Sequence, residues 1–484
     1  MLQNKLFLRT MFMGILLLVA GCVQVPKKGG FDQVQQMVNE RINVQPSWNQ
    51  GVAENRQIEE ALDTLLENEL TAEGAIQIAL LNNARLQARY EELGISQAEL
   101  IQAGLLQNPT VFGFARFPTS SPGATNLEIG FLQNFLNILM LPARQKIAAA
   151  QFEQVKAEVA HDVLQVTAEA ERAYYEALGA ANIRHLRSRV VAAAQASYEF
   201  ALRLHGAGNI SDLSLSVEQG QFEESRISLV ESENQLRAAR EKLTKLMGLW
   251  GGRTKWRTPD QLPDIPPKEG ILEQVETLAI MNRLDLEAAR KKIDTFAQTL
   301  GTTIAWRWLA DAETGVNAER DTDRQWVVGP EISIELPIFD QRQAKISQGE
   351  ALLRREISEL TALAVDIRSE VRLLRDKLIM QRYLIDHYKR VILPLRQRIV
   401  ALTLEKYNYM LVGAFDLLAA KQQEFNAYTK YLEVVRDYWI IRADLGRAVG
   451  GRLPAVSPST DKPAAPSRTP EGFKSPADGH EHKP

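Results

Sequence analysis

The chain contains one sequence unit twice, and this duplication constrains its fold more than any other feature. Asn82-Asn83-Ala84-Arg85-Leu86 has a counterpart 200 residues later in Asn282-Arg283-Leu284-Asp285-Leu286. Ser211-Asp212-Leu213 has a counterpart in Phe415-Asp416-Leu417, with 204 residues between the two aspartates. Matches that keep their order and spacing indicate an internal repeat. The 484 residues are therefore two copies of one unit of about 200 residues, with a segment before them and a tail after them.

Long helical runs dominate each copy. We expect a first helix, two short strands, a very long helix, a break of small residues and a return helix, in that order. The expected helices are 70–105, 143–205 and 212–248 in the first copy, and 270–300, 343–409 and 415–449 in the second. A helix of some 60 residues is roughly 90 Å long, far more than the diameter of a compact domain.

Both return helices carry an apolar residue at every seventh position. These residues are Leu215, Phe222, Leu229, Leu236 and Leu243 in the first copy, and Leu418, Phe425, Leu432 and Trp439 in the second. Sustained heptads are typical of coiled-coil faces. We therefore expect each long helix and its return helix to form a coiled-coil hairpin, with these stripes as packed core.

Between the first helix and the long helix of each copy, polarity alternates with a period of two. In 326–336 the even positions are apolar, whereas the odd positions include Glu331, Ser333 and Glu335. We expect strands at 111–117, 127–131, 304–308 and 326–336, with polar links at 118–126 and 311–324. Any one of these pairs is also compatible with an ordinary soluble hairpin that buries one face.

A sheet of only four strands has a consequence in lipid. Short strands with one apolar face, separated by polar loops, are the signature of an outer-membrane β-barrel. Tryptophans at the strand ends suit a membrane interface. An open sheet cannot lie in lipid with unpaired edges, and a closed barrel needs at least about eight strands. Several protomers must therefore contribute strands to one barrel, and three copies would give twelve.

The N-terminus has the order of a bacterial secretory signal: Lys5 and Arg9, an apolar run at 11–20, and small residues before Cys22. Val19-Ala20-Gly21-Cys22 resembles a bacterial lipobox, in which the cysteine is acylated and becomes the new N-terminus. Cys22 is the single cysteine of the chain. The residue after it is Val23 and not the Asp of an inner-membrane retention signal, which favours the outer membrane. A plain signal peptide with a chance cysteine is the alternative.

The composition excludes several classes of protein. The formal net charge is -3, from 57 basic and 60 acidic residues, so no basic field recruits nucleic acid. A mean hydropathy of -0.21 and a single apolar run exclude a multi-helix membrane protein. The sequence contains no nucleophile elbow, Walker A loop or His-Glu-x-x-His motif. We therefore expect neither an enzyme nor a cofactor, apart from the covalent lipid on Cys22.

Several short segments, taken in order, resemble the TolC family of outer-membrane efflux channels over roughly residues 65–451. They are Leu106-Gln107-Asn108-Pro109, Gly329-Pro330, Leu336-Pro337-Ile338-Phe339-Asp340 and the return helix from Asp416 to Leu445. The resemblance implies a mainly α fold with a small membrane β part. In that fold, a tandem-repeat protomer gives four strands to a trimeric 12-stranded barrel, and its coiled-coil hairpins form a periplasmic tunnel.

The resemblance also implies a function and partners. A homotrimer of this family is the outer-membrane exit duct of a tripartite efflux system, which conducts small solutes passively from a periplasmic membrane-fusion adaptor and an inner-membrane pump. The segment from Gly30 to Trp48 resembles lipoprotein channels of the heavy-metal efflux branch. This likeness implies heavy-metal ions as solutes and a proton-driven pump of the RND type. The implied location is the outer membrane of a Gram-negative bacterium, with a lipid anchor on the periplasmic side.

In the family the hairpin tips dock the adaptor. By position, the tips of this chain are 206–211 and 410–415. The residues implied at the contact are Gly206, Gly208, Asn209, Met410, Leu411, Val412 and Gly413. The apolar run Met410-Leu411-Val412 suits a partner surface. The glycines are also what a simple helix reversal requires.

Tyr407 and Asp416 match positions where the family builds its closed-state gate and a lumen-facing acidic ring. A three-fold ring of Asp416 would favour cations in a narrow throat. The chain departs from the family pattern at Val412, where the best-known member has a gating Arg, and at Ala419, where it has a second Asp. Asp416 is equally suited to capping the return helix.

The C-terminal tail differs in composition from the repeats. Residues 452–484 hold seven of the 20 prolines, together with Ser, Thr and Ala, so we expect this tail to be disordered. His480 and His482 near its end could transiently hold a divalent metal ion, although two histidines alone do not define a metal site.

The expected domain map follows from these points. It assigns 1–21 to a lipoprotein signal peptide, 22–68 to the lipid anchor and periplasmic N-terminal segment, 69–250 to efflux repeat 1, 251–269 to a linker, 270–451 to efflux repeat 2 and 452–484 to the tail. Two other functions stay open: a type I secretion duct for proteins, and a periplasmic structural coiled-coil lipoprotein that makes no pore.

Overall fold

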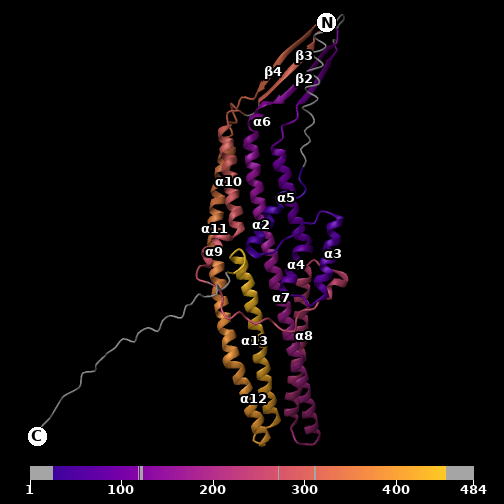
Figure 1. The fold of residues 1–484 in the computed structure, drawn as a ribbon, viewed down its shortest axis with the longest axis vertical. Helices are drawn as coiled ribbons and strands as arrows, with labels where there is room; N and C mark the ends of the chain where they lie inside the picture. The colour runs from indigo at the N-terminus through magenta and orange to yellow at the C-terminus, as the bar shows by residue number, and fades with distance from the viewer. Residues whose placement is uncertain (1–24, 118, 120–123, 271, 310–311, 454–484) are drawn as a thin grey trace, which may run out of the picture.

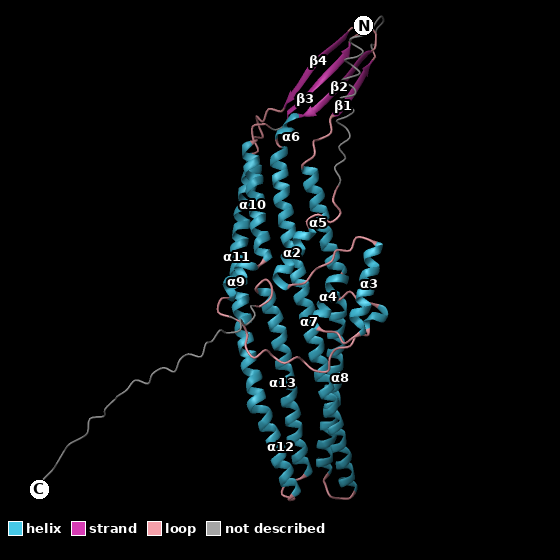
Figure 2. Cartoon of the chain, in the orientation of Figure 1, coloured by secondary structure: helices cyan, strands magenta, loops and turns pink. Residues whose placement is uncertain are grey.

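The computed structural model describes residues 25–453 except 118, 120–123, 271 and 310–311. The predicted acylation site at Cys22 and the tail histidines His480 and His482 therefore lie outside the described residues. The described chain forms a long rod (Figure 1). A small sheet occupies one end, the tips of two helical hairpins occupy the other, and helices run lengthwise between them (Figure 2).

The secondary structure follows the two copies. Two helices come first, α2 (Phe31–Ile42) and α3 (Val52–Glu67). The first copy consists of α4 (Ala72–Asn82), α5 (Ala84–Ala103), β1 (Thr110–Arg116), β2 (Asn126–Asn134), α6 (Phe135–Leu139), α7 (Leu141–Gly206) and α8 (Asp212–Leu246). After the 3-10 helix η1 (Gly251–Thr254), the second copy consists of α9 (Val275–Asn282), α10 (Leu284–Ala305), β3 (Ala312–Arg320), β4 (Trp326–Ile334), α11 (Gln343–His387), the π-helical η2 (Tyr388–Ile392), α12 (Leu393–Asn408) and α13 (Ala414–Ala448).

The predicted order of elements is confirmed, but the prediction of one continuous first helix is wrong in both copies. α4 ends and α5 begins at Asn83, whose side chain accepts hydrogen bonds from the backbone N–H groups of Arg85 (2.9 Å) and Leu86 (3.1 Å). An asparagine in this role caps the start of a new helix. In the second copy Arg283 separates α9 from α10, with extended backbone at φ -70° and ψ 124°.

The prediction of a strand at 304–308 is also wrong. Ile304 and Ala305 end α10, and the third strand is β3, which lies within the expected polar link. The four described strands pair antiparallel in the order β1-β2-β3-β4. Two of the apolar side chains of β3, Ala312 and Ala318, are small, so the alternation of polarity along this strand is weak in the sequence. Pairing of Val316 with Phe131 on β2 supplies apolar contact that β3 lacks by itself.

The long helices of the two copies differ. α7 runs for 66 residues without interruption, whereas its counterpart is divided into α11 and α12 by the five π-helical residues of η2. Pro394 lies in the first turn of α12. Proline has no backbone N–H and its ring clashes with the preceding turn, and a π turn is a common way for a helix to accommodate such an interruption.

α7 is the central helix of the described chain and contacts α8, α13, α10, α5, α4 and α2. Small residues permit this close packing: a Cβ added to Gly179 would lie 2.5 Å from Cγ of Arg436 on α13. The N-terminal α2 is held by an aromatic cluster in which the rings of Phe31 and Tyr90 lie 5.1 Å apart and Trp48 packs beside them. None of the helices in the described ranges combines the length and the apolar character that a membrane crossing requires.

Candidate functional site

The first hairpin tip turns at Gly208, directly after the end of α7 at Gly206. Gly208 has left-handed backbone, with φ at +73°. Its N–H donates to the carbonyl of His205 (2.8 Å), and the N–H of Asn209 donates to the carbonyl of Leu204 (2.8 Å). These bonds satisfy carbonyl groups that the end of a helix would otherwise leave without partners.

Side chains secure the start of the return helix at this tip. Ser211 is the cap residue of α8, and its hydroxyl accepts a hydrogen bond from the N–H of Ser214 (3.2 Å). His205 Nε2 on α7 lies 2.6 Å from Asp212 Oδ1 on α8. This polar contact ties the two helices together across the turn.

The second tip has the same backbone with a different residue at the turn. Met410 takes the left-handed conformation, with φ at +57°. Its N–H donates to the carbonyl of Tyr407 (2.9 Å), and the N–H of Leu411 donates to the carbonyl of Lys406 (3.0 Å). The side chains of Met410 and Leu411 are 93% and 71% exposed, so this tip presents apolar surface to its surroundings.

Asp416 caps the return helix of the second tip. Gly413 precedes α13 and has no side chain to accept a bond, and Asp416 Oδ2 instead accepts the N–H of Gly413 (2.9 Å). The capping interpretation therefore has support in the geometry, and the acidic ring stays a prediction. Tyr407 lies at the same tip, but in the described residues no hydrogen bond joins it to Asp416. Val412 lies half-buried between the two.

At the opposite end of the rod, one face of the sheet carries carboxylates, together with exposed apolar side chains such as Phe114 and Val327. Residues that pair across an antiparallel sheet share a face and alternate along each strand, so Glu128, Glu319 and Glu331 lie on the same side. Glu128 accepts hydrogen bonds from Asn317 Nδ2 (2.7 Å) and from Arg116 Nη2 (2.9 Å). This face therefore carries a surplus of carboxylates.

The other face of the sheet is apolar and open. The register places Val111, Ile129, Val316, Val328 and Ile332 on it, and each of these side chains is more than half exposed. A soluble hairpin buries its apolar face, whereas this sheet leaves it uncovered in the described protomer.

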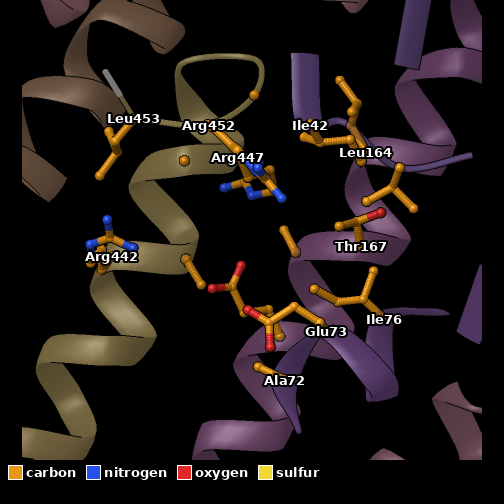
Figure 3. Close-up of a pocket in the computed structure, with 16 residues that line it drawn as sticks. Ile42, Ala72, Glu73, Ile76, Leu164, Thr167, Arg442, Arg447, Arg452 and Leu453 are labelled. Carbon is orange, nitrogen blue, oxygen red and sulfur yellow. The ribbon is translucent and has the colours of Figure 1, made fainter. Parts of the chain in front are cut away.

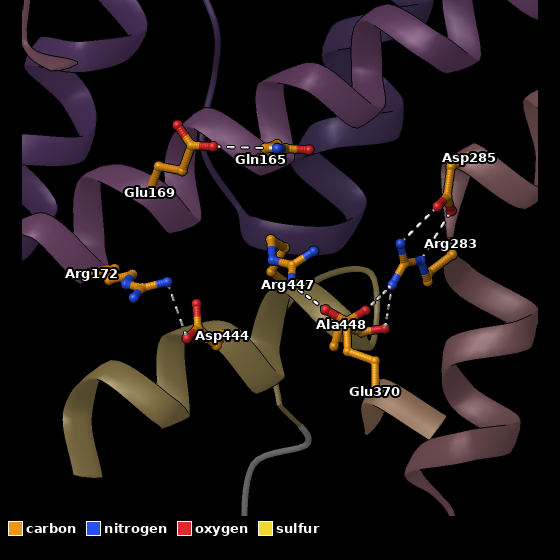
Figure 4. Close-up of polar contacts among 9 residues, drawn as sticks. All are labelled: Gln165, Glu169, Arg172, Arg283, Asp285, Glu370, Asp444, Arg447 and Ala448. Atoms are coloured by element: carbon orange, nitrogen blue, oxygen red, sulfur yellow. Dashed lines mark hydrogen bonds and ion pairs between the residues drawn. The ribbon is translucent and has the colours of Figure 1, made fainter. Parts of the chain in front are cut away.

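A cluster of charges joins three helices of the second copy at mid-length (Figure 4). Arg283, 8% exposed, donates from Nη2 to Asp285 Oδ2 (2.7 Å) and from Nη1 to Glu370 Oε2 (3.0 Å). Arg447 on α13 binds the other oxygen of Glu370. Burial is the largest single influence on Asp285 and would raise its pKa, but the hydrogen bonds and positive charge of Arg283, together with smaller contributions from His161 and the N–H of Leu286, hold this pKa below its ordinary value.

One ion pair extends this cluster to the first copy. Asp444 on α13 lies 3.6 Å from Arg172 on α7. Burial raises the pKa of Asp444, and the positive charge of Arg172 opposes that shift. The two copies are therefore connected through charges as well as through packed side chains.

In each copy, the break between the first two helices lies against the end of the return helix, and we call this contact the joint of that copy. The joint of the first copy is made by neutral side chains. Asn82 Nδ2 donates to the carbonyls of Met247 (3.0 Å) and Gly248 (2.8 Å), and Asn83 Nδ2 donates to the carbonyl of Leu246 (2.8 Å). The sequence reasoning recognised these residues as part of the repeat but missed their role. Two asparagines directly before a helix-forming run were the available signal, because asparagine favours the cap position.

A left-handed glycine closes each joint. Gly248 has φ at +66° and Gly450 has φ at +80°. A Cβ added to Gly248 would lie 2.3 Å from the carbonyl oxygen of Asn82, and one added to Gly450 would lie 3.0 Å from that of Asn282. Glycine is therefore required at both positions for two reasons: the left-handed backbone conformation, and the close approach of the asparagine carbonyl.

The described ranges contain no group of three or more His, Cys, Asp or Glu side chains arranged to hold a metal ion. The weak metal prediction at His480 and His482 concerns the tail beyond residue 453.

Comparisons with known proteins agree with the fold. Residues 75–249 match the family model described as outer membrane efflux protein, which confirms the resemblance indicated by the sequence. The cobalt-zinc-cadmium resistance protein CzcC of Cupriavidus metallidurans is 24% identical over 400 residues, covering 79% of this chain and 90% of that protein.

Two solved structures share the fold at low sequence identity. CusC, described as a protein that forms a transmembrane channel, has a TM-score of 0.63 at 16% identity and covers 90% of this chain and 99% of its own. The Campylobacter jejuni CmeC outer membrane channel has a TM-score of 0.64 at 12% identity, covering 90% of this chain and 94% of its own. The predicted mainly α fold with a small β part is confirmed.

Proposed function

We propose that this chain, a member of the outer membrane efflux protein family, is the outer-membrane exit duct of a tripartite efflux system. The observation that carries the proposal is the sheet. It has one exposed apolar face, a second face that carries the carboxylates, and a long stack of helices below it. A lipid-facing exterior and a water-filled interior require this division of faces in a membrane barrel. The chain acts as a conduit and not as an enzyme.

The sheet supports assembly into a closed ring. In the described residues β1 and β4 each pair on one side only, and lipid offers no hydrogen bonds to such edges. Pairing β1 of one protomer with β4 of the next removes both edges, and three protomers make a twelve-stranded barrel. Two protomers would already supply eight strands, the lower end of known single-chain barrels, and the choice of three protomers rests on the resemblance to the trimeric channel family.

Exposed apolar stripes on the hairpins support the same ring. Leu213, Val217 and Ile227 lie on one face of α8, and each is more than two-fifths exposed. Exposed apolar residues also follow helical spacing along α11, η2 and α12: Leu373, Met380, Val391, Leu395 and Leu402. Surfaces of this kind are covered by partner helices in coiled coils. Neighbouring protomers that cover them would form the walls of a periplasmic tunnel.

The lipid anchor at Cys22 is compatible with the position of the N-terminal segment. Gly30 packs against Phe152, eleven residues into α7, so it lies about 17 Å below the sheet end of that helix. The eight residues between Cys22 and Gly30 reach up to about 27 Å when extended. An acyl group on Cys22 can therefore enter the periplasmic leaflet of the outer membrane, beside the barrel. Labelling with radioactive palmitate in the wild type and in Cys22→Ser tests the anchor.

The two tips are the proposed docking points for a periplasmic membrane-fusion adaptor. Both lie at the end of the rod away from the sheet (Figure 1), and the second tip exposes Met410 and Leu411. The adaptor would connect the duct to a proton-driven inner-membrane pump of the RND type. Heavy-metal ions are the proposed solutes, because CzcC is named for cobalt, zinc and cadmium resistance.

Planar-bilayer recording tests the duct directly. Purified full-length protein should give unitary conductance steps, whereas a structural coiled-coil lipoprotein gives none, and that result would overturn the proposal. A deletion strain should become more sensitive to cobalt, zinc and cadmium than its parent. Unchanged metal tolerance together with loss of a secreted protein would instead assign the duct to type I secretion.

The proposed cation preference of the throat needs a variant that separates charge from capping. Asp416→Asn keeps an oxygen that can accept the N–H of Gly413, but it removes the negative charge. Reversal potential in a salt gradient should shift toward lower cation preference in Asp416→Asn and in Asp416→Ala alike. An unchanged potential in Asp416→Asn would leave Asp416 with the capping role only.

A further inference from the structure

A cavity of about 350 Å³ lies where the N-terminal segment and the two copies meet (Figure 3). Its walls come from the end of α2 and the residues after it, from α4, from α7 and from α13 with the residues that follow it. The apolar part of the wall includes Ile42, Ile76, Leu164 and Leu453. The remaining part is charged, and the two signs lie on different sides.

The acidic side consists of Glu73 on α4 and Glu171 on α7. Neither carboxylate makes a hydrogen bond or an ion pair in the part of the chain that the structure describes. Burial raises the pKa of Glu171, and the nearby charges of Arg442 and Arg452 oppose that rise. Glu171 is half-buried and lines the cavity, so its carboxylate oxygens are free to accept hydrogen bonds from a group bound there.

The basic side consists of Arg442, Arg447 and Arg452, which Figure 3 shows across the opening from Glu73. Arg447 is already paired with Glu370 on α11. Arg442 Nε lies 3.5 Å from Glu269. The backbone N–H of Arg452 donates to the carbonyl of Arg41 (3.1 Å), which fixes this residue at the rim and leaves its guanidinium exposed.

The two charged sides face each other without touching. In the described residues no ion pair within 4 Å joins Glu73 or Glu171 to any of the three arginines. Arg442 and Arg452 attract Glu171 across the cavity, but this attraction leaves the hydrogen-bonding groups on the two sides without direct contact with each other. The separation therefore fits an occupant that carries both charges.

We infer that this cavity binds a small zwitterion. Its ammonium group would contact Glu171 and Glu73, its phosphate or carboxylate would contact Arg452 and Arg447, and its short methylene chain would lie against Ile76 and Leu164. The two carboxylates repel an anion that binds alone, and Arg452, which has no ion pair in the described residues, repels a cation that binds alone. Bidentate hydrogen bonding makes arginine well suited to phosphate and carboxylate.

The location gives such a ligand a defined effect. It would bridge the N-terminal segment, the first copy through α4 and α7, and the second copy through α13. A ligand that binds only the folded arrangement stabilises it in proportion to occupancy. The site therefore offers a way for a periplasmic solute to set how firmly the two copies are held together, and it is independent of conduction through the duct.

Calorimetric titration of the full-length protein in detergent tests the site. The probes are phosphoethanolamine and glycylglycine as zwitterions, with ethanolamine and inorganic phosphate as singly charged comparisons. At least one zwitterion should bind saturably and at least tenfold more tightly than either singly charged probe. Phosphoethanolamine binding alone would identify a lipid headgroup as the source, and glycylglycine binding alone would identify a free amino-acid-like solute. Absence of saturable binding by both, or equal binding of phosphate alone, would overturn the inference.

Matched variants locate the binding. Glu171→Gln and Arg452→Gln should each weaken the zwitterion at least tenfold. Glu169→Gln lies on the same helix, but Glu169 bonds Gln165 outside the cavity (Figure 4), so its affinity should stay within twofold of the wild type. Unchanged affinity in Glu171→Gln would overturn the proposed site. Circular dichroism and the melting temperature of each variant distinguish a lost site from a lost fold.

Discussion

The two copies make the same joints with different chemistry. In the first copy, Asn83 holds the end of α8 with a neutral amide. In the second copy, Arg283 stands at the matching place, donates to the carbonyl of Ala448 and is bound by Asp285 and Glu370. In both copies a backbone carbonyl at the end of the return helix accepts the hydrogen bond. The donor is the amide of Asn83 in the first copy and the guanidinium of Arg283 in the second, whose positive charge is balanced by two carboxylates.

The two hairpin tips likewise share their backbone geometry and differ in their side chains. Gly208 and Met410 have nearly the same left-handed backbone and make the same pair of turn bonds, although only glycine adopts that conformation without strain. The return helix is capped by the hydroxyl of Ser211 in one copy and by the carboxylate of Asp416 in the other. Backbone geometry is therefore the conserved part of the duplication, and side chains are free to diverge wherever they still satisfy it.

The largest expected effect comes from removing the charged donor. Arg283→Ala leaves Asp285 partly buried without its cation and Glu370 with Arg447 alone, and it should lower the free energy of unfolding by about 3–5 kcal/mol. Asn83→Ala removes only a neutral cap and should cost about 1 kcal/mol. Urea titration in detergent measures both, with Arg226→Ala, an exposed ion pair with Glu223, as the control. Equal costs for Arg283→Ala and Asn83→Ala would contradict the contrast between the joints.

The tips predict effects of opposite sign. Met410→Gly should raise the free energy of unfolding by about 1 kcal/mol because it relieves left-handed strain, and Gly208→Met should lower it by a similar amount. The melting temperatures of the two variants and of the double exchange report the difference. If Met410→Gly lowers the melting temperature, as Gly208→Met is expected to do, contacts of the Met410 side chain stabilise its turn by more than the left-handed strain costs.

The stability contributed by the two joints should differ in its dependence on pH. The pKa of Asp285 is lowered in the folded protein, so its stabilising contribution is present above the ordinary aspartate pKa of about 3.9 and is lost as pH falls through the folded value. Asp285→Asn should therefore be less stable than the wild type at pH 7 and equal to it near pH 2. The control is Asn83→Asp, which introduces a carboxylate into the first joint without a paired arginine. A pH-independent difference for Asp285→Asn would show that shape, and not charge, holds the second joint.

The smallest effect concerns the long helices. The π-helical residues Tyr388–Ile392 interrupt α-helical bonding beside Pro394, whereas α7 is continuous. Hydrogen exchange should be up to about tenfold faster in 388–392 than in the corresponding turns of α7 in the first copy, because local opening begins where bonding is least regular. Pro394→Ala should remove most of that difference. Uniform protection along both helices would mean that packing alone sets their rigidity.

Much of this architecture could be predicted because it is local or repeated. The heptads at Leu215–Leu243 and at Leu418–Trp439 indicated the hairpins, and the repeat fixed their number. β3 was missed because small residues such as Ala312 and Ala318 show no alternation strong enough to separate a strand from a loop. The break at Asn83 was missed although asparagine favours a cap position, and the break at Arg283 carries no such signal because arginine is a good helix former.

The cavity and the charged joint could not have been found from the sequence. Glu171 and Arg452 are 281 positions apart, and only the packing of α13 against α7 brings them to one opening. Arg283 and Glu370 are similarly remote. The tip residues, in contrast, were located correctly as turns because glycine and the end of a heptad run mark a reversal directly.

The unpaired edges of the sheet also suggest an order for the assembly of the protein. The helical rod can complete its bonding in water as soon as one chain has been exported, whereas β1 and β4 in the described protomer have no neighbour on their outer sides. Protomers that meet first through their hairpins would bring these edges together before lipid surrounds them. Assembly in the periplasm would then come before insertion, and a lone chain, however well its helices fold, would remain a precursor.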